Sequence, residues 1–241
     1  MNKNPLRPGR VLGLIPAKGS STRLPGKNVR MLEGKSLLER TVDSSRQSGV
    51  LDRVCVSTED PEIAVQARRL GVDLPFMRPP HLARDPAGVV EVALHALDEW
   101  EKLGEFFDTL IILLTTSPLR AGTDIVKALQ RYVESGEDFL MSVSREEHSP
   151  LSSLILQNGL LQPLHPEWLM HTGARKTGET PVCVRANGAV TIVDIRRFRK
   201  EKNYYAFPLV AYEMPWERGI DIDTERDFAM AEWAIKNRPA P

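Results

Sequence analysis

The stretch from Pro16 to Asn28, PAKGSSTRLPGKN, has residue types that suit the binding of a polyphosphate. It combines two glycines, three hydroxyl residues, two lysines and an arginine, and it follows the short apolar run VLGLI at 11–15. Small residues let backbone N–H groups approach phosphate oxygens, and cationic side chains balance the phosphate charge. Because the apolar run predicts a buried first strand, the loop would lie at the carboxyl end of that strand.

This loop matches neither of the two commonest phosphate-binding motifs. Six residues separate Gly19 from Gly26, and Asn28 follows Lys27, so the P-loop pattern is absent. The three spaced glycines of dinucleotide-binding folds are absent as well. A charged Gly/Ser/Pro-rich stretch can also be an ordinary basic surface loop, and it is the position directly after a strand that favours a ligand site.

A second group of candidate residues lies in the segment GIDIDTE at 219–225. Asp221 and Asp223 are two residues apart, so in an extended segment their carboxylates project to the same side and could share one hard cation. Thr224 could instead be the N-cap of a final helix, with Asp227 at its third position. Capping explains the threonine but not two aspartates that alternate with isoleucines, which favours the metal site.

Two further loops carry polar residues, TTSPLR at 115–120 and RPPHLARD at 78–85. The first follows a long apolar run, and in open α/β sheets ligands bind beyond the carboxyl ends of such strands. Ser117-Pro118 is also an ordinary turn signal, and Thr123 or Asp124 can cap the helix that follows. Both a ligand loop and a structural turn therefore remain open at 115–120.

The elements that must position these loops alternate along the chain. Apolar runs predict strands at 11–15, 53–58, 109–114, 139–143, 189–193 and 207–212, and amphipathic patterns predict helices at 36–48, 61–70, 88–103, 124–134 and 224–236. Unbroken apolar strands that alternate with amphipathic helices predict an α/β fold with a mainly parallel sheet covered on both faces. The basic run at 196–200 is most simply the solvated face of a short helix.

The alternation breaks between about Glu146 and Arg185. This segment has prolines at 150, 163, 166 and 181, several histidines and no long helical period. It is too long to be a mere connection in a compact domain, so we expect it to recognise substrate or to contact another subunit. The expected organisation is a single domain over residues 1–241, with 146–185 as an insertion.

Composition narrows the class of protein. A chain of 241 residues, 41% hydrophobic and 27% charged, can form one large α/β domain with a substantial core. Its formal net charge of zero gives no reason to expect nucleic acid or another polyanion as a partner. Cys55 and Cys183 form neither a disulfide framework nor a metal spacing. With no apolar run of transmembrane length and no signal core in the first ten residues, we expect a cytoplasmic protein without membrane contact.

The motifs, in this order, resemble those of the CMP-sialate synthetases, also called acylneuraminate cytidylyltransferases. The opening loop of that family is similar at Pro16, Ala17, Gly19, Leu24, Pro25, Lys27 and Asn28. The similarity continues through STEDPEIA at 57–64, the 78–85 loop, TSPLR at 116–120, NGA at 187–189 and IDIDTERDF at 220–228. The resemblance therefore extends from about Leu12 to Glu232 and rests on six collinear motifs.

The sequence departs from this family at a few positions. Lys18 replaces a loop arginine, Thr22 replaces a loop lysine with Arg23 beside it, and the loop is also similar to that of spore-coat polysaccharide nucleotidyltransferases. Leu114 and Thr191 stand where the sialate enzymes usually carry a glutamine and a tyrosine. In the sialate enzymes this glutamine and this tyrosine belong to the sugar side of the site. We therefore expect the acceptor to be an acidic sugar other than N-acetylneuraminate.

The resemblance implies a Rossmann-like, GT-A-like nucleotidyltransferase that transfers CMP from CTP to a sialic-acid-like sugar acid and releases diphosphate. Attack on the α-phosphate by an anomeric hydroxyl needs charge neutralisation and in-line positioning more than covalent chemistry. Asp221 and Asp223 would hold Mg²⁺ or Mn²⁺, and Lys18, Lys27 and Asp223 would be the catalytic residues. The expected nucleotide-binding residues are Ala17, Lys18, Gly19, Arg23, Lys27, Asn28 and Arg78.

On the sugar side, the acceptor carboxylate requires a cation. Arg175, Lys176 and Arg185 are the candidates, with Arg175 the first choice. Asn187 and Tyr204 are the other expected sugar-binding residues, although packing in the core is the commoner explanation for the pair Tyr204 and Tyr205.

The resemblance also implies a homodimer, because sialate synthetases use the region that corresponds to 146–185 to pair subunits. A lid on a monomer is the alternative. Two other functions stay open: a nucleotidyltransferase that acts on a sugar phosphate, and a non-catalytic nucleotide-binding relative.

Overall fold

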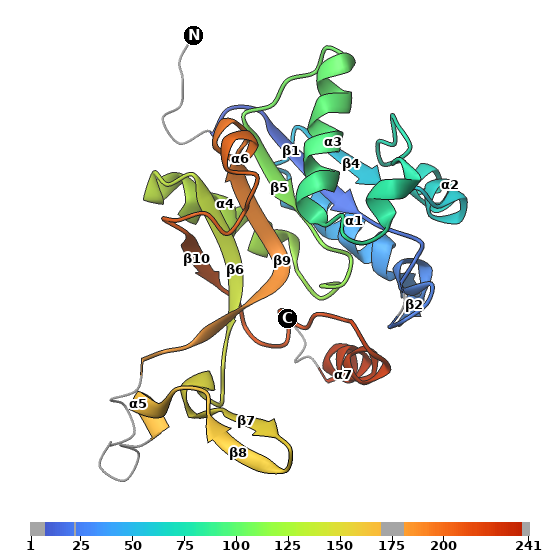
Figure 1. Ribbon diagram of the computed structural model, residues 1–241. Coiled ribbons are helices and arrows are strands. Elements are labelled where there is room, and N and C mark those ends of the chain that lie inside the picture. Colours follow the sequence, from blue (N-terminus) through green and yellow to red (C-terminus); the bar gives the residue numbers. More distant parts are fainter. Residues whose placement is uncertain (1–7, 22, 170–180, 238–241) are drawn as a thin grey trace.

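The structure is a computed structural model that describes residues 8–21, 23–169 and 181–237 (Figure 1). A six-stranded sheet forms its centre, in the order β10-β6-β9-β5-β1-β4. Only β9 runs antiparallel to its neighbours in this sheet, so the predicted mainly parallel α/β sheet is confirmed. The strands are β1 Val11–Pro16, β4 Arg53–Ser57, β5 Thr109–Ile112, β6 Phe139–Arg145, β9 Val184–Asp194 and β10 Val210–Glu213.

Helices cover both faces of the sheet because successive residues of the buried strands point to opposite sides. On β1, Val11 and Ile15 pack in one buried cluster, whereas Leu12 and Leu14 pack in another. The first cluster includes α1 Leu37–Ser48, α2 Pro61–Arg69 and α4 Gly122–Ser135, and the second includes α3 Val89–Lys102 and α6 Ile195–Glu201. The predicted helices therefore form, with α4 beginning two residues earlier than expected.

A third cluster joins the loops of interest to the last helix, α7 Glu225–Lys236. Leu24, Leu119, Ile220 and Ile222 come from three of those loops and pack together with α7. The shared core explains how loops that lie far apart in the sequence are held in one place. Its buried members are Leu24, Leu32, Leu37, Leu119, Ile220, Ile222, Phe228, Ala231 and Ala234.

Short elements lie between the main ones. They are the 3₁₀ helices η1 Lys27–Val29 and η2 Pro80–Ala83 and the two-stranded pair β2 Met31–Leu32 and β3 Lys35–Ser36. In the described part of the chain, no helix is both long enough and apolar enough to cross a membrane.

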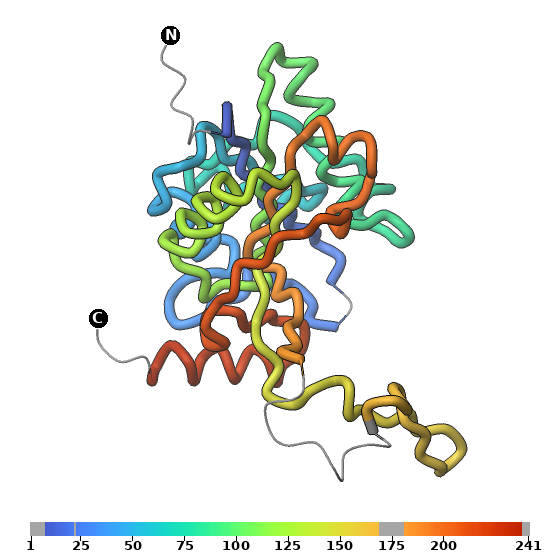
Figure 2. The backbone as a smooth tube through the Cα atoms, turned by 90° about the vertical axis from the view of Figure 1, so that its left-hand side faces the viewer, coloured from blue at the N-terminus to red at the C-terminus, as the bar shows by residue number. Residues whose placement is uncertain are grey.

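Within the segment from Glu146 to Arg185, residues 146–169 form an arm that projects from the body of the molecule (Figures 1 and 2). It carries η3 Pro150–Ser152, a hairpin of β7 Leu154–Gln157 and β8 Leu160–Pro163, and the short α5 Pro166–Leu169. Regular structure is therefore present in this segment, contrary to the irregular chain that the sequence pattern predicts. The hairpin strands have four residues each and consecutive exposed apolar side chains, so they lack the alternation that identifies a half-buried strand.

Candidate active site

A cavity of about 180 Å³ lies at the carboxyl ends of β1 and β5. In an open α/β sheet this is the edge where ligands bind. Its walls include residues from each loop that the sequence singles out except the acidic segment. They are Pro16, Lys18, Lys27, Asn28, Arg78, Leu82, Ala87, Gly88, Val89, Val92, Leu114, Thr115 and Thr116.

Asn28 ties together the loops around this cavity. Its side-chain amide donates to the Lys18 carbonyl over 2.7 Å, and its amide oxygen accepts a hydrogen bond from the Thr115 hydroxyl. The side chain is nearly fully buried, and both hydrogen bonds are internal to the protein. Asn28 therefore fixes the loop after β1 against the loop after β5, whatever it contributes to a ligand.

Asp223 is the point where the cationic loop and the acidic segment meet. The Lys27 ammonium donates to Asp223 Oδ1 over 2.9 Å and to the Ile222 carbonyl over 3.2 Å. The Arg23 guanidinium lies 2.8 Å from Asp223 Oδ2. The predicted phosphate ligands and one predicted metal ligand are thus in direct contact, although almost two hundred residues separate them in the sequence.

The acidic segment alternates as its sequence predicts. Ile220 and Ile222 are buried against α7, whereas Asp221 and Asp223 point away from that cluster. The Ile222 N–H donates to the Thr116 carbonyl over 2.7 Å, which holds the segment beside the loop after β5. Desolvation raises the pKa of the Asp221 carboxyl, a hydrogen bond with the Thr116 side chain lowers it, and the nearby charge of Asp223 raises it, with a net upward shift.

These two carboxylates are residues that could hold a magnesium ion, provided that the ion also takes oxygens from a ligand. Among the described residues no group of three or more His, Cys, Asp or Glu side chains could enclose a metal. Mg²⁺ usually keeps several waters and is held by one or two carboxylates together with substrate phosphates. Two carboxylates, from Asp221 and Asp223, suit that mode of binding. They are too few for a site in which protein side chains alone surround the ion.

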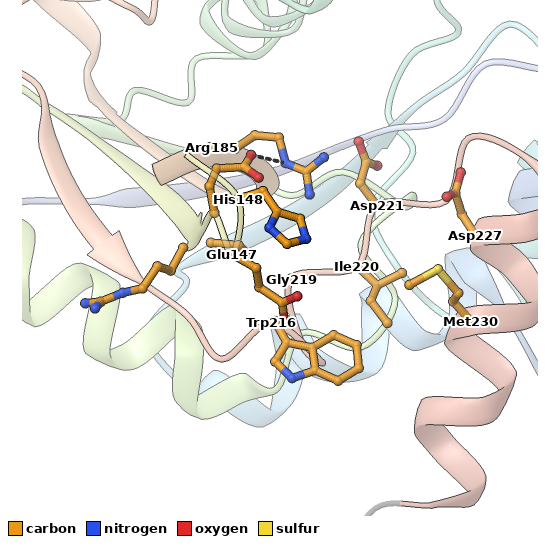
Figure 3. A pocket seen from close by; sticks show the side chains of 12 residues that line it. Glu147, His148, Arg185, Trp216, Gly219, Ile220, Asp221, Asp227 and Met230 are labelled. Atoms are coloured by element: carbon orange, nitrogen blue, oxygen red, sulfur yellow. Dashed lines mark ion pairs between the residues drawn. The ribbon is translucent and has the colours of Figure 1, made fainter. Parts of the chain in front are cut away.

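A second cavity, of about 520 Å³, has Asp221 in its lining (Figure 3). Arg185 from β9 lines it, with its Nε 3.2 Å from Glu146, and His148 lies beside them. Trp216, Ile220 and Met230 supply the apolar part of its lining (Figure 3). The Thr116–Asp221 pair separates this cavity from the smaller one, because Thr116 lines one and Asp221 the other.

Asn187 makes its hydrogen bonds within the protein. Its amide oxygen accepts from the Ser142 hydroxyl over 2.6 Å and from the Ala189 N–H over 3.1 Å, and its nitrogen donates to Ser144 over 3.0 Å. Ser142 lies at the irregularity in the pairing of β6 with β9, so Asn187 fills the place of the missing ladder contacts. In this structure Asn187 lines neither cavity, and its side chain holds Ser144, which lines the larger one.

The other predicted sugar-side residues are more scattered. Tyr204 is half-buried against the cluster that includes α3 and lies 5.1 Å from the ring of Tyr205, and it lines neither cavity. Arg175 and Lys176, like Thr22 of the first loop, lie outside the described residues. Their assignment to the site therefore stays a prediction.

The sequence pattern predicts only a helix-capping role for Asp124. Its buried carboxylate caps α4 through the Ala121 N–H, but it also accepts two hydrogen bonds from Arg218 over 2.9 and 3.0 Å. This pair anchors the chain that leads into the acidic segment. Arg218 directly precedes the Gly219 motif, yet no local pattern could have linked it to an aspartate 94 positions earlier.

Comparison with known proteins identifies relatives over nearly the whole chain. The family described as Cytidylyltransferase matches residues 12–231. The chain is 31% identical over 226 residues to a CMP-N,N'-diacetyllegionaminic acid synthase of Legionella pneumophila, covering 92% of this chain and 95% of that protein. It is 29% identical to an N-acylneuraminate cytidylyltransferase of Streptococcus agalactiae, covering 89% of this chain but only 51% of that longer protein.

A solved structure has the same fold. The CMP:2-keto-3-deoxy-manno-octonic acid synthetase complexed with CTP superposes with a TM-score of 0.67, covering 94% of this chain and 98% of that one. The sequence identity is 15%, so the likeness concerns the fold alone.

Proposed function

This chain belongs to the cytidylyltransferase family, and on that premise we propose that it transfers CMP from CTP to a nonulosonic or related 2-keto sugar acid. One observation carries the proposal: Lys27 and Arg23 of the loop after β1 meet Asp223 beside the cavity that Lys18 and Arg78 line. This arrangement offers cations for a triphosphate and carboxylates for its metal at one edge of the sheet.

The reaction needs positioning and charge neutralisation rather than a covalent enzyme intermediate. The anomeric hydroxyl oxygen of the acceptor forms a bond to the α-phosphorus of CTP and gives up its proton to solvent. The bond between that phosphorus and the bridging oxygen to the β-phosphate breaks. Diphosphate leaves with that electron pair. Lys18, Arg23 and Lys27 would stabilise the negative charge that builds on the phosphate oxygens.

The proposal includes Mg²⁺, or Mn²⁺, held by Asp221 and Asp223. When bound, the ion would neutralise phosphate charge and help orient the triphosphate. In the structure Asp223 pairs with Lys27 and Arg23. These two cations would therefore exchange a carboxylate for phosphate oxygens as the nucleotide enters.

Arg185 is the described candidate for the acceptor carboxylate. It lines the larger cavity beside Asp221, where it would exchange Glu146 for the carboxylate of the sugar acid. Arg175 stays the first choice from the sequence.

We place the reaction in the cytoplasm. Both Cys55 and Cys183 are free thiols in the structure, which suits a reducing compartment.

An assay of diphosphate release tests the function directly. CTP with a panel of nonulosonic and eight-carbon 2-keto acids should give turnover, and calorimetry should rank CTP ahead of ATP, GTP and UTP. Turnover only with a sugar phosphate, or a clear preference for another triphosphate, would place the protein with a different class of nucleotidyltransferase. CTP binding without any turnover would favour a non-catalytic relative.

Substitution of Lys27 should separate phosphate contacts from nucleoside contacts. In Lys27→Ala we expect the dissociation constant for CTP to rise by about tenfold or more, and that for CMP by much less, because the ammonium is proposed to meet the distal phosphates. Calorimetry with the two nucleotides measures both constants. Lys35→Ala removes an exposed lysine that lines neither cavity and serves as the control. Equal losses for CTP and CMP would contradict the role given to Lys27.

We also propose a homodimer whose contacts involve the segment from Glu146 to Arg185, which contains the projecting arm. Leu156 and Leu161 of the hairpin are 71% and 63% exposed, and Leu154, Ile155 and Leu160 beside them are exposed as well. Contiguous exposed apolar side chains on a projecting element indicate a protein contact surface. The hairpin also projects away from the body of the molecule (Figure 2).

Light scattering should therefore give a dimer at micromolar concentration. The double variant Leu156→Glu and Leu161→Glu should shift it to monomer while the thermal unfolding of the body is retained, because both side chains lie on the outside of the arm. The control is Leu103→Glu, an exposed leucine on the body of the protein. A wild-type monomer would contradict the dimer, and proteolytic cleavage within the arm that substrate suppresses would favour a lid.

A further inference from the structure

The turn between β4 and α2 lies between the two halves of the proposed nucleotide site. Glu59, in this turn, directs one carboxylate oxygen to each half. Its Oε1 accepts a hydrogen bond from the Gly19 N–H over 2.7 Å, and its Oε2 lies 3.8 Å from a terminal nitrogen of Arg78. Gly19 belongs to the loop after β1, whereas Arg78 lines the cavity from the opposite loop.

Because the guanidinium of Arg78 is buried, a nearby negative charge is needed to stabilise its charged form. Its side chain is 3% exposed, and it donates to the Ser57 hydroxyl over 3.1 Å and to the Ser57 carbonyl. Burial lowers the pKa of this guanidinium, and the charge of Glu59 opposes that shift. Glu59 Oε2 is itself buried and accepts no hydrogen bond from the described residues, so it stabilises Arg78 through charge.

The loop after β1 rests directly on the same turn. A Cβ atom at Gly19 would lie 2.2 Å from Asp60 Oδ2, so only glycine allows the loop to approach this closely. Asp60 is fixed in turn, because its Oδ1 accepts from the Glu62 and Ile63 N–H groups at the start of α2. The turn is thus a rigid support for both the phosphate loop and the arginine.

We propose that Glu59 is a positioning residue that sets the spacing between the phosphate loop and Arg78, and through them the affinity for the nucleotide. Its carboxylate lines neither cavity, so it acts through Gly19 and Arg78 and does not touch the ligand. This inference rests on the proposed function, because it assumes that CTP spans the two groups. The acceptor side of the site should be unaffected.

Two substitutions separate the two contacts. Glu59→Gln keeps an oxygen that can accept from Gly19 but removes the charge beside Arg78, and Glu59→Ala removes both. We expect Glu59→Gln to raise the dissociation constants of both CTP and CMP by about tenfold, and Glu59→Ala to weaken CTP further. Glu59→Asp should restore part of the loss, and Glu62→Gln, an exposed carboxylate on α2, is the matched control.

The decisive measurement is a double-mutant cycle with Arg78→Gln. Calorimetry gives the dissociation constants of CTP and CMP, and kinetics give the KM values for CTP and for the acceptor. In the Arg78→Gln background, Glu59→Gln should cause no further loss, and the acceptor KM should stay within about twofold of wild type. Unchanged CTP affinity in a folded Glu59→Gln protein, or losses that multiply in the double variant, would overturn the inference. If wild-type protein binds no CTP, the proposed function fails instead.

Discussion

Asp223→Asn should lower the turnover number by about a thousandfold or more while the protein keeps its fold. The substitution removes the charge that faces Lys27 and Arg23 and that is proposed to hold the metal. The start of α7 does not depend on this carboxylate. Thr224 and Asp227 cap that helix reciprocally, since the Asp227 N–H donates to the Thr224 hydroxyl over 3.3 Å and Asp227 Oδ2 accepts from the Thr224 N–H over 2.8 Å.

The comparison for this prediction is Glu225→Gln two residues further on. Glu225 is exposed and pairs with Arg30 outside the cavities, so this variant should keep activity within about twofold. Binding of Mn²⁺ followed by electron paramagnetic resonance, with CTP present, distinguishes a lost metal ligand from a lost ion pair. Full activity of Asp223→Asn, or unchanged Mn²⁺ binding, would remove the metal assignment.

The acidic segment shows what a local pattern can predict. Asp221 and Asp223 alternate with isoleucines, and that alternation alone places both carboxylates on the side opposite the α7 core. The apolar runs and amphipathic periods likewise predicted the sheet and its covering helices. The residues that are buried on a strand or on one side of a helix recur at a fixed spacing, so the local sequence shows them.

Long-range pairings were not predictable in the same way. Glu59 stands in an ordinary helix-start motif, and nothing near it indicates that its partners are Gly19 and Arg78. The internal role of Asn187 depends on an irregularity in the pairing of two strands that are far apart in the sequence. Such contacts follow from tertiary geometry, and one sequence supplies no periodicity that encodes them.

N-acetylneuraminate should be a poor acceptor, with a kcat/KM roughly tenfold to a hundredfold below that of the best nonulosonic acid. Leu114 lines the smaller cavity and lies against Gly188, where a Cβ atom would be 2.9 Å from the leucine side chain. Thr191 on β9 pairs with Ile112, two residues before Leu114, at the same edge of the sheet. By resemblance, this is where the sialate enzymes present an amide and an aromatic hydroxyl.

A polar group of the sugar that meets Leu114 instead of an amide loses a hydrogen bond in a closed site, at a cost of about 1–3 kcal/mol. An acceptor with an apolar substituent at that position loses nothing. The carboxylate anchor should persist in both cases, so Arg175→Ala should raise the acceptor KM far more than the CTP KM. Comparing kcat/KM for N-acetylneuraminate, its deaminated analogue, the diacetamido nonulosonates and the eight-carbon ulosonate measures the preference.

Leu114→Gln should reverse part of this preference by improving N-acetylneuraminate relative to the other acceptors, because it restores the missing hydrogen-bonding group. Leu114→Met keeps the apolar character and volume, so it is the matched control and should leave the ranking unchanged. If N-acetylneuraminate proves the best substrate of the wild-type protein, the role given to Leu114 and Thr191 is wrong. If the ranking holds but Leu114→Gln does not shift it, specificity comes from other residues, with Arg185 and the larger cavity beside Asp221 the next to test.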